Sequence, residues 1–90
     1  TPARYAEVFR RTPIKRLKLP RLLRNACVVA GNSGDVAVLP ALMELASYEL
    51  PMVRVHAVWA IFRLGGAEKL ASHHASETDE EVLSEYAAWA

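Results

Sequence analysis

Residues 50–66 read LPMVRVHAVWAIFRLGG, and this stretch decides the fold. The proline near its start is favoured in the first turn of a helix, and the two glycines at its end commonly stop one. Apolar side chains occupy nearly every side of the helix between them, whereas a surface helix keeps one polar face. The pattern therefore predicts a helix over 51–64 that is buried between neighbouring helices.

A similar stretch lies about 31 residues earlier, at 19–35, and reads LPRLLRNACVVAGNSGD. The two Leu-Pro pairs are 31 residues apart, a spacing of 30 places Arg24 over Arg54 and Cys27 over Ala57, and a one-residue gap then aligns the glycine turns. Each copy reads as a helix, a glycine turn and a second helix. Repeats of this length in helical pairs are typical of stacked solenoids, in which neighbouring units bury the apolar face that one unit leaves open.

The rest of the chain carries the same helical signals. Strand-like alternation and Asn-Gly or Asp-Gly hairpin turns do not occur in the sequence. Pro40 lies inside an apolar helical pattern and is expected to kink that helix or to delay its regular start. Thr78 and Glu81 form a capping-box pattern at the start of the last helix. The expected helices span 20–31, 35–47, 51–64, 67–75 and 79–90.

These patterns predict an all-α, HEAT-like helical-repeat (α-solenoid) domain of about four to six helices. Residues 1–19 are expected to form a basic lead-in segment with a short helix. Residues 20–90 are expected to form the repeat domain, with helix pairs at 20–49 and 50–77 and a final helix at 79–90. In the first helix, the side chains expected to share the buried face are Leu22, Ala26, Val29 and Ala30.

The composition fits one small globular domain, with 52% hydrophobic and 23% charged residues in 90. Cys27 is the sole cysteine, so nothing indicates a secreted, disulfide-bonded protein, and its alignment with Ala57 predicts a small buried side chain. No apolar run approaches the roughly 18 residues of a membrane span, and no signal peptide is recognised. A cytoplasmic location without a membrane partner is therefore expected. The chain begins at Thr1 without Met, which predicts a fragment of a longer protein.

Charges are strongly separated along the chain. Residues 1–25 hold eight lysines and arginines against the single acid Glu7, a net charge of +7, and the other 65 residues hold three against nine acids, a net charge of −6. Such asymmetry predicts a polyanion-binding segment, because lysine and arginine pair with phosphate. The candidate RNA-binding residues, among which Lys15 and Arg16 are the preferred phosphate contacts, are Arg10, Arg11, Lys15, Arg16, Lys18, Arg21, Arg24 and Asn25.

Two of these candidates have structural alternatives. Arg24 could pair with an acid in the adjacent turn, for which Asp35 is one candidate. Asn25 could cap a neighbouring backbone group. Arg54, which aligns with Arg24 in the repeat, has the same option to pair with an acid, and for Arg54 the structural interpretation is preferred.

Other chemistry-bearing side chains are interpreted as structural. The adjacent His73 and His74 would point about 100° apart on a helix, which is a poor geometry for one metal ion. His56 lies in an apolar helix and is expected to be hydrogen-bonded. The aromatic residues could stack on bases, but their helical spacing favours packing between helices. These aromatic residues are Trp59, Phe62, Tyr86 and Trp89.

Three short motifs narrow the repeat to one family. They are TPIKR at 12–16, RLLRNACVVAGNSGD at 21–35 and VAVLPAL at 36–42. In this order they resemble the C-terminal region of epoxyqueuosine reductase, where a G/S/T-P-I-x-R element leads into L-R-N-x-x-x-x-x-G-N-x-G-D and a HEAT pair. The V-R-x-x-A-x-x-A-I…L-G pattern at 53–65 is similar to a HEAT repeat, and the whole resemblance covers residues 5–64.

The resemblance implies an enzyme whose catalytic region and tRNA-holding region are separate parts of one polypeptide. The family reduces epoxyqueuosine to queuosine at the wobble position of certain tRNAs, with a cobalamin and two [4Fe–4S] clusters held N-terminal to the HEAT-like part, which helps hold the tRNA. A cluster needs four cysteine thiolates and Cys27 is alone, so this chain by itself is expected to hold no cofactor and to catalyse nothing. Its expected partners are the tRNA anticodon stem-loop and the catalytic region of the same polypeptide.

Two other functions remain open. Helical repeats commonly serve as protein–protein interaction scaffolds with no nucleic-acid role, and a solitary domain could stabilise a catalytic neighbour without a ligand of its own. The +7 segment favours RNA, because scaffolds usually bind through apolar surfaces of mixed charge. Burial of residues 10–18 in pairs with acids would instead favour a scaffold.

Overall fold

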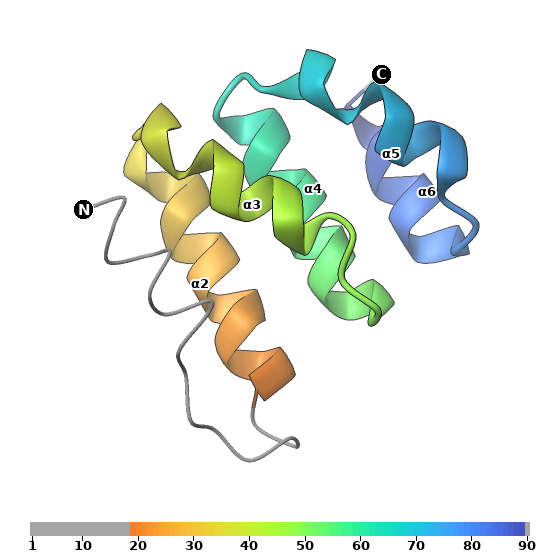
Figure 1. Cartoon of the computed structure of the whole chain (residues 1–90), viewed down its shortest axis with the longest axis horizontal. Coiled ribbons are helices and arrows are strands. Elements are labelled where there is room, and N and C mark those ends of the chain that lie inside the picture. The colour runs from red at the N-terminus through yellow and green to blue at the C-terminus, as the bar shows by residue number, and fades with distance from the viewer. Residues whose placement is uncertain (1–18, 90) are drawn as a thin grey trace.

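Helix α4 (Pro51–Arg63) is the centre of the fold. The structure is a computed structural model that describes residues 19–89. In it, α4 lies between α2 (Leu19–Ser33) and α6 (Glu80–Ala88), and the three helices run side by side in the same direction (Figure 1). The expectation of a helix buried between neighbours is confirmed. The side chains that α4 buries are Val53, Ala57, Val58, Ala60 and Ile61.

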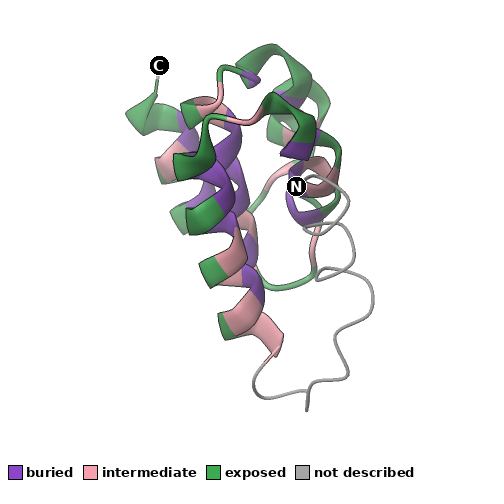
Figure 2. Ribbon diagram, turned by 90° about the vertical axis from the view of Figure 1, so that its left-hand side faces the viewer, coloured by how far each residue is buried: buried purple, intermediate pink, exposed green. Residues whose placement is uncertain are grey.

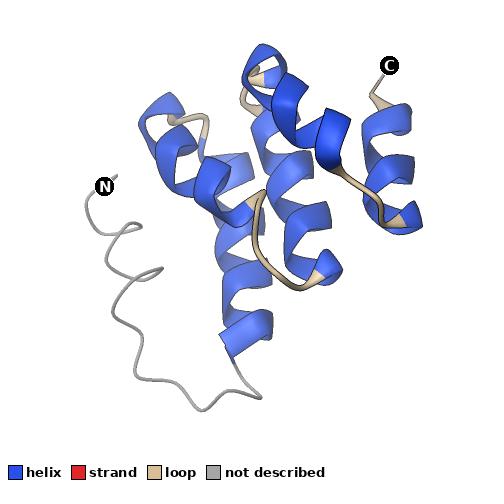
Figure 3. Ribbon diagram, turned by 45° about the vertical axis from the view of Figure 1, so that its right-hand side comes forward, coloured by secondary structure: helices blue, strands red, loops and turns tan. Residues whose placement is uncertain are grey.

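A second layer of helices covers one side of this row (Figure 3). It contains α3 (Leu39–Leu45), which packs on α4, and α5 (Ala71–Ser76). Each of them follows a short 3-10 turn, η1 (Val36–Val38) and η2 (Ala67–Leu70) respectively. Residues 19–89 therefore form five α-helices and no strand, which confirms the all-α prediction. Nearly all of the predicted lead-in segment, together with residue 90, lies outside the described part of the chain.

Pro40 delays the start of α3, as its position in the sequence predicts. Proline lacks the backbone N–H that a helix interior needs, but this group is not used in the first turn. The backbone first forms η1, and the regular helix starts at Leu39 with Pro40 in its first turn. Asp35 opens this segment, because its Oδ1 accepts a hydrogen bond of 3.0 Å from the backbone N–H of Ala37.

The hydrophobic core lies between the two layers (Figure 2). Its largest fully buried side chains include Leu23 of α2, Leu42 of α3, Ile61 of α4 and Leu70 of η2. Burying one such side chain stabilises a fold by about 1.5–3 kcal/mol. Because the core draws its side chains from both layers, each layer depends on the other for its stability.

The buried face of α2 differs from the predicted one. Of the predicted residues only Ala30 is buried, while Leu22 and Ala26 are partly buried and Val29 is 54% exposed. The side chains that α2 does bury are Leu23, Cys27, Ala30 and Gly31. The predicted face was wrong because two apolar stripes run along this helix, and α4 packs against the stripe that contains the smaller residues. Small residues let two helix backbones come close.

Helices α2 and α4 come closest at Gly31. A Cβ atom at this position would lie 2.6 Å from Cζ3 of Trp59 and 3.0 Å from Cα of Ala60. No side chain fits there without movement of α4, so this contact requires glycine. The helix also runs past its predicted end at residue 31 and stops before Gly34, whose φ of +71° is the left-handed conformation that ends many helices.

Arg54 of α4 ties two connecting segments together. Its Nε and Nη2 donate to the carboxylate of Glu77, between α5 and α6, at 2.9 and 3.0 Å. Its Nη1 donates to the backbone carbonyls of Tyr48 and Glu49, between α3 and α4, at 2.8 and 3.1 Å. The exposed fractions of the two side chains are 16% for Arg54 and 6% for Glu77. The structural interpretation of Arg54 is confirmed.

Asp79 caps the last helix. Its Oδ2 accepts hydrogen bonds from the backbone N–H groups of Glu81 at 3.0 Å and Val82 at 3.2 Å, and α6 begins at Glu80. The predicted capping box with Thr78 at the cap is therefore wrong by one residue. Threonine and aspartate both cap helices, so the sequence pattern alone does not separate these two neighbours.

Replacing Asp79 with alanine is expected to lower the free energy of unfolding by about 1 kcal/mol, because two backbone N–H groups lose their acceptor. Thr78→Ala is the matched control, since Thr78 is exposed, and its expected effect is below about 0.5 kcal/mol. Denaturant titration followed by circular dichroism measures both. Equal losses in the two variants would show that Asp79 is not the cap.

Candidate nucleic-acid interface

The outer face of α2 presents Arg21 and Asn25. Helical spacing places these two side chains opposite Leu23 and Cys27, which are buried. Both Arg21 and Asn25 are exposed, as the sequence predicts. Val28, 37% exposed, shares this face, which therefore offers a cation, an amide and an apolar side chain to a ligand.

Arg24 lies at the edge of this face and is partly buried. Its Nε and Nη2 each lie 3.4 Å from Oδ1 of Asn25, which are long, weak hydrogen bonds. Asp35 caps η1 rather than pairing with Arg24, and within residues 19–89 Asn25 caps no backbone group. Neither structural alternative for Arg24 and Asn25 is found in the described part of the chain, so both side chains can turn towards a ligand.

The other candidates precede α2 and lie outside the described residues. They belong to the segment that joins the α2 end nearest Arg21, because α2 begins at Leu19. Their contact with RNA stays a prediction. These candidates are Arg10, Arg11, Lys15, Arg16 and Lys18.

Beside α2, the outer face of α4 presents Trp59 and Arg63. Nε of Arg63 donates a hydrogen bond of 3.0 Å to Oδ1 of Asn32 on α2. The guanidinium carbon of Arg63 also lies 5.6 Å from the centre of the Trp59 ring, within the range of a cation–π interaction. Neither Asn32 nor Arg63 was predicted to belong to a site. They are 31 residues apart, so the repeat spacing itself could have identified this pair.

The other aromatic residues pack between α4 and the C-terminal helices. The Phe62 ring stacks on Trp89 with ring centres 5.4 Å apart and meets Tyr86 edge-on at 6.0 Å. The His74 ring stacks on Tyr86 at 4.1 Å. Packing between helices is therefore confirmed for Phe62, Tyr86 and Trp89. Trp59 differs, because its indole reaches across to α2 at Gly31.

His56 and Cys27 have the structural roles predicted for them. Nδ1 of His56 lies 2.8 Å from the carbonyl oxygen of Met52, and because a carbonyl only accepts, Nδ1 is the donor. Cys27 is fully buried, and burial raises the pKa of its thiol to about 12, so the thiol is protonated at neutral pH. Such a cysteine is an inert core residue.

The residues of this chain do not fit an iron–sulfur cluster. A [4Fe–4S] cluster takes four thiolates, whereas the sequence contains one cysteine and that thiol is buried and protonated. Within residues 19–89, no three or more His, Cys, Asp or Glu side chains are grouped so that they could hold a metal ion. None of the helices described here combines the length and the apolar character needed to cross a membrane.

Comparison with known proteins gives no significant match: neither a family model, nor a curated protein, nor a solved structure is similar to this chain. The resemblance to epoxyqueuosine reductase therefore stays a prediction that rests on the motifs of the chain itself.

Proposed function

We propose that this chain is a HEAT-like module that binds tRNA for an epoxyqueuosine reductase-like enzyme. In this role the basic segment and the outer face of α2 hold phosphates of the anticodon stem-loop. A catalytic region elsewhere in the longer polypeptide carries the cobalamin and the [4Fe–4S] clusters, and this chain performs no chemistry itself. A tRNA partner also implies a cytoplasmic protein.

The observation that carries this proposal is the charge separation across the fold. Residues 1–25, with their net charge of +7, lead into and include the first turns of α2. Residues 67–89 hold six acids and one lysine, and they end in α6. Helices α2 and α6 lie on opposite sides of α4 (Figure 1). A polyanion is therefore attracted more strongly to the α2 end of the row than to the α6 end.

Two features support the HEAT-like part of the proposal. Helices α2 and α4 run in the same direction and in contact, and each is followed by a returning helix in the second layer (Figure 3). The hydrogen bond between Asn32 and Arg63 joins residues one repeat period of 31 apart. Stacked helix pairs share a continuous core in this manner.

Titration of the chain with a tRNA that carries a GUN anticodon, at several salt concentrations, tests the proposal. Affinity is expected to fall steeply as salt rises, because each neutralised phosphate releases counterions. Arg21→Glu is expected to weaken binding about tenfold, as for loss of one phosphate contact. It is also expected to reduce the slope of log affinity against log salt concentration by about one. The double variant Lys15→Glu, Arg16→Glu is expected to reduce the slope by about two.

Lys69→Glu is the matched control for Arg21→Glu. Lys69 is also exposed, and the substitution changes the net charge by the same amount, but it lies in η2, outside the row that carries Arg21. Its effect on affinity is expected to be small. Equal losses in the two variants, or binding that does not respond to salt, would argue against the proposed interface.

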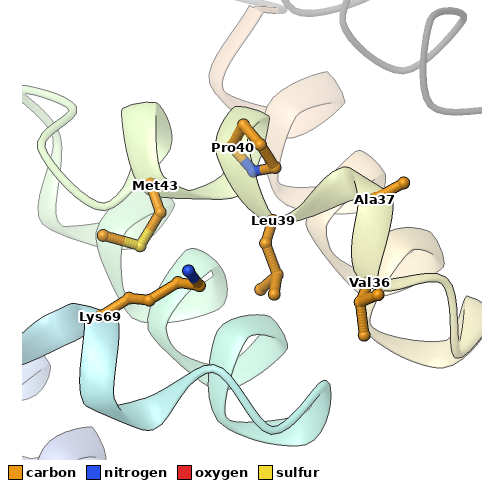
Figure 4. A pocket seen from close by; sticks show the side chains of 6 residues that line it. All are labelled: Val36, Ala37, Leu39, Pro40, Met43 and Lys69. Atoms are coloured by element: carbon orange, nitrogen blue, oxygen red, sulfur yellow. The ribbon is translucent and has the colours of Figure 1, made fainter.

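A protein–protein scaffold is the second candidate function, and an apolar hollow favours it. This hollow, about 410 Å³ in volume, lies between the η1–α3 segment and η2 (Figure 4), and Val36 at its rim is 61% exposed. The tRNA titration separates the two candidates, because a scaffold would show no steep salt dependence towards tRNA. The residues that line the hollow are Val36, Ala37, Leu39, Pro40, Met43 and Lys69.

A further inference from the structure

One groove of about 290 Å³ is lined by residues of α2, α4 and α6, and one of them is Val28, which shares the outer face of α2 with Arg21. Its volume is at the small end of ligand-binding clefts, which span roughly 300–1,000 Å³, so it suits one ring system rather than a large ligand. The residues that line this groove are Val28 and Asn32 of α2, Val55, His56 and Trp59 of α4, and Glu85 of α6.

Trp59 gives the groove a flat aromatic wall. Arg63, one turn after Trp59 on α4, lies against the ring, whereas Val55 and His56, one turn before it, line the groove beside it. Val28, 37% exposed, adds a second apolar wall from α2. A planar aromatic ring held between apolar walls is a surface on which another flat ring stacks well.

Three polar side chains in the groove keep hydrogen-bonding groups to spare. Asn32 accepts from Arg63 through Oδ1, which leaves its amide N–H groups without a partner among residues 19–89. Glu85 accepts a hydrogen bond of 2.7 Å from Nε1 of Trp89 through Oε2, which leaves Oε1 as an acceptor for a ligand. His56 donates through Nδ1 to the carbonyl of Met52, which leaves Nε2 as an acceptor for a ligand. Donors and acceptors side by side match the edge of a nucleobase, which carries both.

Cations flank the groove on the same face. Arg63 lies beside Trp59, and Arg21 lies further along α2. This arrangement complements a strand whose phosphates lie on both sides of one inserted base. In a two-fold pair of identical chains joined through this face, the same cations would approach each other, so a second copy is the less favourable occupant.

We propose that the groove takes one unpaired base of the nucleic acid strand that α2 binds, stacked on Trp59 and hydrogen-bonded by Asn32, His56 and Glu85. This inference rests on the proposed function and adds that the bound RNA contributes an unpaired base as well as phosphates. Sequence-specific recognition of RNA mostly uses such splayed single-stranded bases.

Two substitutions on neighbouring residues test this groove. Val28→Glu places a carboxylate in it, while Val29→Glu adds the same charge to the same helix at a position that is 54% exposed and outside the groove. Both variants are expected to fold, since both positions face solvent. With a labelled single-stranded RNA, Val28→Glu is expected to bind about tenfold more weakly than Val29→Glu, as for loss of one stacked base. With a duplex RNA of equal length, the two variants are expected to bind equally.

Indole fluorescence gives a direct second readout. In a Trp89→Phe background, Trp59 is the only tryptophan, and its emission is expected to be quenched when single-stranded RNA saturates the protein. Binding without quenching, or equal affinities of Val28→Glu and Val29→Glu for single-stranded RNA, would overturn the base-binding groove and leave the proposed function standing. If the wild type sediments as a dimer and Val28→Glu dissociates that dimer, the groove binds a second copy of the chain. This result would also overturn the base-binding proposal. Absence of any RNA binding at low salt would overturn both proposals.

Discussion

Replacing Arg54 with alanine is expected to destabilise the domain by about 1–3 kcal/mol, since a partly buried carboxylate then loses the charged donor of its two hydrogen bonds. That carboxylate belongs to Glu77, whose side chain is only 6% exposed. The same substitution also removes the donor to the carbonyls of Tyr48 and Glu49. The segment between α3 and α4 and the segment between α5 and α6 therefore lose a side chain that bonds to both.

Arg63→Ala is the control for this effect, because Arg63 is an exposed arginine on the same helix. It loses one side-chain hydrogen bond and one exposed cation–π contact, together about 1 kcal/mol or less. Denaturant titration of wild type and both variants measures the difference. If Arg54→Ala proved no more harmful than Arg63→Ala, the hydrogen bonds of Arg54 would contribute little to stability.

The same ion pair makes the domain sensitive to acid. Burial alone would raise the pKa of Glu77, but the hydrogen bond from Arg54, those from the backbone N–H groups of Asp79 and Thr78, and the charge of Arg54 hold it below its ordinary value of 4.5. The unfolded chain therefore takes up this proton at a higher pH than the folded chain does. Stability from Glu77 is present above pH 4.5 and is lost as the pH falls through the lowered value, a loss that Glu77→Gln is expected not to show.

The sequence was sufficient to predict α4 but not the contacts that hold it. Proline and paired glycines mark its ends, and its all-round apolar pattern matches its central position. The partner of Arg54 was not predictable, because Glu77 is 23 residues away and the chain between them carries no signal for the pair. Local patterns define helices, whereas contacts between connections depend on how the helices are arranged.

The candidate interface was predictable in part for the same reason. Arg21 and Asn25 are exposed whichever apolar stripe of α2 faces the core, so their exposure was correctly predicted although the buried face was not. The groove at Trp59 was not predicted, because its lining comes from three helices that are far apart in the sequence. Its existence depends on the rotation of α2, which the close contact at Gly31 determines.

Substituting valine for Gly31 is expected to destabilise the domain by about 3 kcal/mol, as for overpacking of a tight core. The nearest atoms are Cζ3 of the bulky Trp59 ring at 2.6 Å and the backbone Cα of Ala60 at 3.0 Å, and the backbone atom can move only if α4 shifts. Even Gly31→Ala is expected to destabilise, although alanine in place of glycine inside a helix usually stabilises by about 1 kcal/mol.

Gly66→Ala is the matched control for Gly31→Ala, since a Cβ at Gly66 would also meet atoms near 3.0 Å. Those atoms are side-chain methyl groups of Leu39 and Ile61, which can shift more easily than a backbone atom, so a smaller loss is expected. In a double-mutant cycle, Trp59→Leu is expected to recover part of the stability that Gly31→Ala loses. The shorter leucine side chain no longer places an atom 2.6 Å from the added Cβ. Additive losses in that cycle, measured by thermal or denaturant unfolding, would show that the Trp59 ring does not limit how closely α2 and α4 approach.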